Sequence, residues 1–224
     1  MTRTSPLLLA FALALASACG ARPDIHYYQL RIDERAMARA DRDSALVFAI
    51  ETMVGDSAYE DPRIVYRTSP YRLDYYHYHR WSAPPGVMLS DFLRDAYEQT
   101  GYFDAVVAGF SPNALVFLSG RLVAFEEVDV APDEWIARVK LNLFLRDAQS
   151  GEVVWSDTLM QEAPVHDLTP EGVAAAMSHA VTRIVADTAP QIAEYARRAH
   201  ERSARRKALD SAFETSAPEP AVPP

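Results

Sequence analysis

The stretch that decides the fold runs from Trp135 to Asp147 and reads WIARVKLNLFLRD. A period of two places one set of apolar residues on one face and polar residues on the other, which predicts a half-buried β-strand. The turn at residues 148–151 leads into a second apolar run, Val153 to Met160, so the two runs form a long hairpin. The inward face consists of Ala137, Val139, Leu141, Leu143 and Leu145, opposed by Arg138, Lys140, Asn142 and Arg146.

Further strands and two helices surround this hairpin. The first helix opens at Pro84-Pro85 and stops near Gly101; the second has Thr169 as N-cap and Pro170 as its first residue. Pro190 is expected to kink or restart the second helix. The other expected strands are His26 to Ile32, Ala45 to Met53, Arg63 to Arg67, Tyr71 to Trp81, Phe103 to Val107 and Ala114 to Val128. The prediction is an α+β fold, a single domain in which helices pack on one side of a mixed, largely antiparallel sheet.

The N-terminus reads as an export signal. Arg3 precedes the apolar run Leu7 to Leu15, which is too short to cross a bilayer, and small residues follow it. Cys19, the single cysteine, stands where a bacterial lipoprotein signal is cut and acylated. Ala16 departs from that pattern and also fits ordinary signal peptidase, which would leave a soluble periplasmic protein. We expect a chain lipid-anchored in the outer membrane and facing the periplasm.

These features divide the chain into four parts. Residues 1–18 are the signal peptide, residues 19–22 the lipidated N-terminus and linker, and residues 23–209 the domain. Residues 210–224 are expected to be a disordered Pro-rich tail. Before this tail, the second helix becomes rich in arginine from Arg197 to Lys207. That segment is either a solvated helix end or a contact for anionic headgroups or an acidic partner.

The strand from Tyr71 to Trp81 carries aromatic rings on both faces, although helices can bury only one face. If Leu73, Tyr75 and Trp81 form the core face, the opposite face presents Tyr76, Tyr78 and Arg80. Tyrosine and arginine are enriched where protein surfaces meet. We therefore predict that these three residues contact a partner or a second copy of the chain.

Composition and motifs argue against an enzyme. The net charge of −9 does not suit nucleic acid, and the chain has no phosphate-binding G-x-x-x-x-G-K-[ST] loop and no G-x-S-x-G nucleophile motif. His77 and His79 lie two apart with no third ligand on their face, and His166 beside Asp167 fits a loop. Glu126 and Glu127 point to opposite faces of a strand, so they cannot act as a pair. We expect no catalytic residue, no cofactor and no metal.

Several segments resemble the ABC-type transport auxiliary lipoproteins (PqiC-like). They are the pair Tyr27-Tyr28, residues 59–67 (YEDPRIVYR), residues 78–84 (YHRWSAP), residues 118–122 and Phe125-Glu126. The resemblance covers about residues 19 to 190; the chain departs from the family pattern at Ala16, at Pro85 and in its C-terminal extension.

The resemblance implies a non-catalytic accessory that docks on an MCE-domain partner in a lipid transport system and binds no ATP itself. Two alternatives remain: a lipoprotein that itself carries lipid, and an envelope-assembly lipoprotein for polysaccharide export or cell-wall synthesis. A homo-oligomer is also compatible with the sequence.

Overall fold

The computed structural model describes residues 23–35, 37, 40 and 46–216, without the side chains of residues 207 and 210–216. The predicted signal peptide, Cys19 and residues 217–224 lie outside the described residues.

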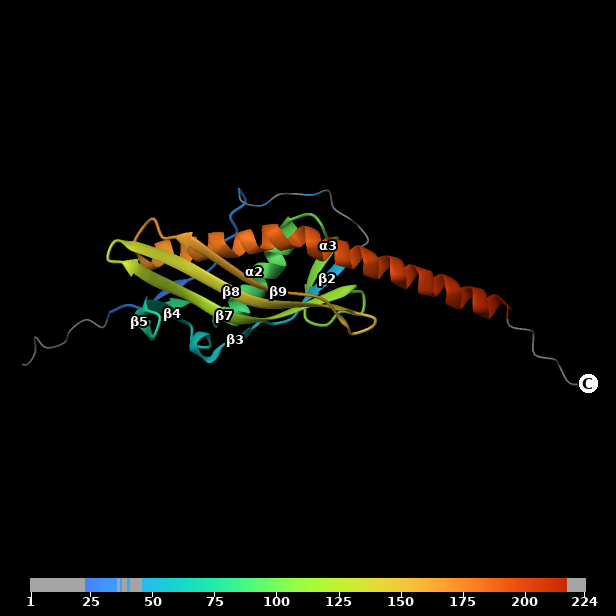
Figure 1. The fold of residues 1–224 in the computed structure, drawn as a ribbon, viewed down its shortest axis with the longest axis horizontal. Helices are drawn as coiled ribbons and strands as arrows, with labels where there is room; N and C mark the ends of the chain where they lie inside the picture. Colours follow the sequence, from blue (N-terminus) through green and yellow to red (C-terminus); the bar gives the residue numbers. More distant parts are fainter. Residues whose placement is uncertain (1–22, 36, 38–39, 41–45, 217–224) are drawn as a thin grey trace, which may run out of the picture.

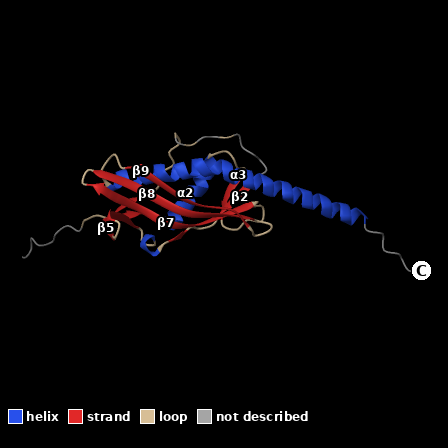
Figure 2. Cartoon of the chain, in the orientation of Figure 1, coloured by secondary structure: helices blue, strands red, loops and turns tan. Residues whose placement is uncertain are grey.

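Two α-helices lie on one side of a curled sheet (Figure 1, Figure 2). The helices are α2 (Pro85–Gln99) and α3 (Pro170–Ser216); η1 (Ser57–Tyr59) is a short 3-10 turn. The strands are β1 (His26–Tyr28), β2 (Val47–Ile50), β3 (Val54–Gly55), β4 (Arg63–Ser69), β5 (Arg72–Trp81), β6 (Ala105–Ala108), β7 (Val116–Ala131), β8 (Glu134–Asp147) and β9 (Val153–Pro164).

The long strand β7 organises the nine-stranded sheet formed by the described residues. One edge of β7 pairs antiparallel with β8 along nearly its whole length, and β8 pairs antiparallel with β9. The other edge is shared by three shorter strands, β2, β3 and β4, each parallel to β7. The long pairings are therefore antiparallel and the short ones parallel, which confirms the predicted mixed, largely antiparallel α+β fold.

The predicted hairpin is confirmed and is longer than expected. All five inward residues of β8, Ala137, Val139, Leu141, Leu143 and Leu145, are fully buried. Strand β9 continues to Pro164, past the expected end at Met160, because it pairs with β8 as far as Ile136. The face that these residues bury is the one that α3 covers (Figure 1).

Helix α2 begins and ends close to the predicted residues, and α3 begins at the predicted residue, Pro170. Gly101 follows α2 with a φ of 76°, a left-handed conformation that glycine adopts without strain. The Thr169 hydroxyl accepts a hydrogen bond from the Gly172 amide at 3.1 Å, as expected of an N-cap. The two helices contact each other through the hydroxyls of Tyr97 and Thr188, 2.7 Å apart and buried.

Helix α3 shows one of the two outcomes expected at Pro190, a bend and not a restart, and it differs from the prediction at its C-terminal end. It runs through Pro190 without a restart, because proline removes one amide donor but leaves the hydrogen bonds on either side in place. The ribbon changes direction in its middle part, as an internal proline allows (Figure 1). The helix also continues to Ser216, so residues 210–216, assigned above to the tail, are helical.

Candidate functional site

The aromatic strand β5 contains a register shift that changes which of its side chains share a face. Arg63 of β4 pairs with Arg80, and Val65 pairs with Tyr75, so two steps along β4 correspond to five along β5. Tyr76 consequently reaches Glu127 of β7, while Trp81 packs on Phe125 at a ring distance of 5.0 Å. Phe125 and Glu127 are two residues apart and share one face of β7, so Tyr76 and Trp81 lie on the same side of the sheet.

The predicted assignment of faces on β5 is therefore wrong for Tyr76. It is half-buried, and its hydroxyl donates to both carboxylate oxygens of Glu127 at 3.1 and 3.0 Å. Its ring also contacts Tyr66 and His79, with centroids 5.1 and 5.5 Å away. Between the two pairings with β4 named above, β5 has three residues more than β4, and because this number is odd the alternation is reversed between Tyr76 and His79, as in a bulge.

Tyr78 and Arg80 remain together on the opposite face, where Tyr27 joins them. Strand β1 runs parallel to β5 at the end of the sheet, with Tyr27 beside Arg80 and His26 beside His79. Tyr27 is 63% exposed and Tyr78 46% exposed, and the buried Nε of Arg80 has no hydrogen-bond partner among the residues that the structure describes. We call Tyr27, Tyr78 and Arg80 the β1–β5 patch. The sequence did not indicate Tyr27 as a site residue, because its pairing with β5 joins segments about 50 residues apart.

On the face of the sheet opposite this patch, side chains of β1 and β5 contact each other. His26 stacks on His79 at 5.4 Å, and the Tyr28 hydroxyl lies 2.9 Å from Nδ1 of His79. Burial and the neighbouring His26 lower the pKa of His79. His77 is exposed, so the structure does not bring His77 and His79 together. Among the described residues, no group of three or more His, Cys, Asp or Glu side chains is placed to hold a metal ion.

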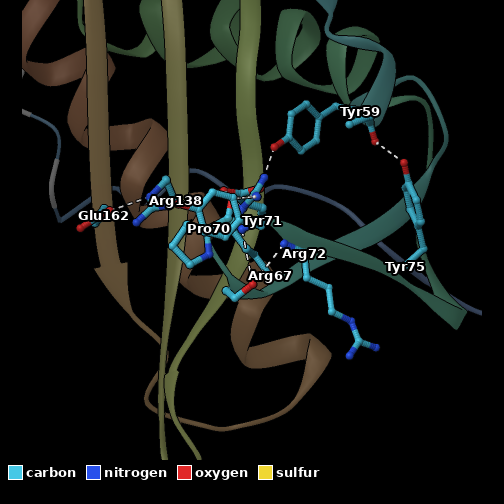
Figure 3. A network of polar contacts seen from close by, with 11 residues as sticks. Tyr59, Arg67, Pro70, Tyr71, Arg72, Tyr75, Arg138 and Glu162 are labelled. Carbon is cyan, nitrogen blue, oxygen red and sulfur yellow. Dashed lines mark hydrogen bonds and ion pairs between the residues drawn. The ribbon is translucent and has the colours of Figure 1, made fainter.

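A polar network surrounds Glu126 on the face of β7 opposite to that of Glu127, and Figure 3 shows its members Tyr59, Arg67, Arg138 and Glu162. The Glu126 carboxylate accepts from the Tyr59 hydroxyl at 2.7 Å and from Nε and Nη2 of Arg67, both at 3.0 Å. Arg138 lies 3.5 Å from the same carboxylate and 2.7 Å from Glu162. Burial and the hydrogen bond to Glu126 raise the pKa of Tyr59, so its hydroxyl stays a donor. This network ties β4, β7, β8 and β9 together.

Glu127, on the other face, has very different surroundings. It is only 1% exposed, and burial together with a hydrogen bond to Asp129 raises its pKa to about 8, although the bond from Tyr76 opposes this. Burial and the charge of Glu127 raise the pKa of Tyr76. Each glutamate is thus occupied by its own partners, and the two do not form a catalytic pair.

A cavity of about 670 Å³ lies between the segment after β1 and the first turns of α3. The segment is held on α3 by the Arg31 amide, which donates to the Ser178 hydroxyl at 3.0 Å, and by the Asp33 amide, which donates to Thr182 at 3.3 Å. The cavity is lined by both aromatic and ionisable side chains, including Tyr27, Tyr28, Asp33, Glu171 and His179. For the alternative in which the lipoprotein itself carries lipid, this cavity is a site at which to look for bound lipid.

In the described part of the chain, none of the helices combines the length and the apolar character that spanning a bilayer needs.

Comparison with known proteins assigns the family. The model of the ABC-type transport auxiliary lipoprotein component family matches residues 28–189, which include β2 to β9, α2 and the first part of α3. The chain belongs to this family and is an auxiliary lipoprotein component of ABC-type transport. No curated protein matches it.

Solved structures show that the fold is shared. Protein XCC0632 from Xanthomonas campestris is similar with a TM-score of 0.67 and 22% identity, over 77% of this chain and 97% of that one. An uncharacterized protein is similar with a TM-score of 0.61 and 16% identity, over 76% of this chain and 99% of that one. At these identities the likeness concerns the fold alone.

Proposed function

We propose that the protein is a non-catalytic, periplasm-facing lipoprotein of the outer membrane, acylated at Cys19, that docks on an MCE-domain partner of a lipid transport system. The observation that carries the proposal is the family match over residues 28–189. An accessory of this kind needs a docking surface rather than a reaction centre, because the ATPase and the permease are separate chains.

The β1–β5 patch is the surface that we assign to this docking. Two exposed tyrosines flank an arginine whose buried Nε lacks a hydrogen-bond partner in the described part of the chain. Tyrosine rings lose little conformational entropy when they are covered, and the hydroxyl and guanidinium groups supply directed hydrogen bonds. The patch also lies on β1, which begins seven residues after Cys19, so the partner would meet the protein close to its anchor.

Site-specific photocrosslinking in cells tests this assignment. A benzophenone amino acid in place of Tyr78 should form a crosslink to the MCE-domain protein, identified by mass spectrometry. The matched control is Phe110, which is 84% exposed and follows β6, at the other end of the strand order from β1. Equal crosslinking from both positions, or none from Tyr78 in a folded and exported chain, would overturn the assignment. Lipid that co-purifies with the isolated chain in native mass spectrometry would instead support the lipid-carrier alternative.

A further inference from the structure

The C-terminal part of α3 is a feature of this chain that the family match does not cover. The match ends at residue 189, whereas α3 continues to Ser216 (Figure 1). Ile192, Ala193, Ala196 and Ala199 still bury one side of the helix, and Ser203 is the last half-buried residue. Beyond it, the described side chains of the helix are exposed, and the helix projects past the sheet.

Four arginines of this part share one side of the helix. Arg198, Arg202 and Arg205 are spaced by four and three residues, which places them in one row along the helix, and Arg206 lies beside them. We call these four residues the basic stripe. All four are exposed, and they stand in a chain whose net charge is −9. The stripe therefore gives an acidic protein a row of basic side chains at one end of its long helix.

Little inside the molecule neutralises the basic stripe. Arg198 pairs with Glu194 at 3.0 Å, but both side chains are exposed, and such surface pairs are weak. Arg202 pairs with the buried carboxylate of Asp147 at the turn between β8 and β9, which fixes the helix on the sheet. Arg205 and Arg206 form no ion pair with the side chains that the structure describes. Their charges are available to an outside partner.

The surroundings of the stripe indicate the chemistry of that partner. After residue 190, the only large apolar side chain that is exposed among those described is Leu209, so this surface offers no apolar seam to a partner helix or groove. A guanidinium binds phosphate through two parallel hydrogen bonds, and a row of arginines fits a surface that repeats this anion. Basic residues beside an anionic bilayer contribute additively to binding.

We propose that the basic stripe binds the surface of a bilayer that contains anionic phospholipids. The geometry makes this a second membrane contact, separate from the N-terminal anchor. The described chain begins at Pro23, four residues after Cys19; its first segment (blue) and the C-terminal end of α3 (red) lie at opposite ends of the long axis of the molecule (Figure 1). With 47 residues, α3 is about 70 Å long. Two contacts so far apart fix the orientation of the domain relative to the membrane, which a lipid on a four-residue linker alone does not.

Vesicle flotation tests the proposal with the mature chain carrying Cys19→Ser, so that no acyl group contributes. The chain should float with vesicles of phosphatidylcholine containing 30% phosphatidylglycerol, and not with pure phosphatidylcholine. Changing Arg198, Arg205 and Arg206 to Gln should reduce partitioning about a hundredfold, since each basic residue contributes about fivefold. Arg202 is left unchanged because it holds α3 on the sheet.

The matched control changes Arg72, Arg146 and Arg183 to Gln, three exposed arginines outside the stripe, and removes the same net charge. It should bind nearly as the unchanged protein does. Equal loss in both triple variants would show a general charge effect and overturn the proposal, as would flotation with neutral vesicles. If the chain does not float with anionic vesicles at physiological salt, the proposal is also overturned, and an acidic protein becomes the candidate partner.

Discussion

The two adjacent glutamates of β7 should respond in opposite ways to the same substitution. Glu127 has a pKa of about 8 in the folded protein, against about 4.5 when unfolded. Because the folded value is raised, this group's contribution to stability is fully present below pH 4.5 and is lost as pH rises through 8. Between pH 5 and pH 8, ionisation in the unfolded state lowers the free energy of unfolding by about 3 kcal/mol.

Glu127→Gln should remove this pH dependence. Glutamine imitates the protonated acid: its carbonyl can accept from the Tyr76 hydroxyl, and its amide can donate to Asp129. Urea unfolding of the mature Cys19→Ser chain should therefore give nearly equal stabilities for both proteins at pH 5. At pH 8 the variant should be more stable by about 3 kcal/mol.

Glu126→Gln is the matched control, one residue away on the same strand. This change removes the carboxylate that accepts from Tyr59 and from both nitrogens of Arg67. Breaking such a largely buried ion pair should cost about 3 kcal/mol at pH 7. The reasoning is refuted if Glu127→Gln keeps the wild-type slope of stability against pH, or if it destabilises the protein as much as Glu126→Gln does.

Three further predictions concern the two ends of the chain and α3. If Cys19 is acylated, a palmitate analogue should label the protein in cells and Cys19→Ala should release it into the soluble periplasm; unlabelled wild type in that fraction would show cleavage by ordinary signal peptidase instead. Thr169→Ala should lower the free energy of unfolding by about 1 kcal/mol, since the Gly172 amide loses its cap; an unchanged urea midpoint would contradict this role. Deleting residues 211–224 should leave stability unchanged within about 0.5 kcal/mol, because they lie past Ser203; a melting temperature lower by several °C would show that they pack on the domain.

Local patterns in the sequence were sufficient to predict most of the helices and strands. The alternation from Ala137 to Leu145 defined β8 and its buried face, because successive side chains of a strand point to opposite sides. Thr169 marked the start of α3, because its side-chain oxygen caps an amide of the first turn. Gly101 marked the end of α2, because its backbone adopts the left-handed conformation that ends a helix. The family resemblance was likewise visible in short segments and is confirmed by the match over residues 28–189.

Only the tertiary structure decided which elements meet and which side chains of β5 share a face. The order of β2, β3 and β4 along one edge of β7 depends on pairings between distant segments, which no local periodicity contains. A single register shift against β4 moved Tyr76 to the side of Glu127 and left Tyr78 and Arg80 beside Tyr27. Because the side-chain period of a strand is two, an odd number of extra residues reverses every face beyond them, and their position is set by the neighbouring strand.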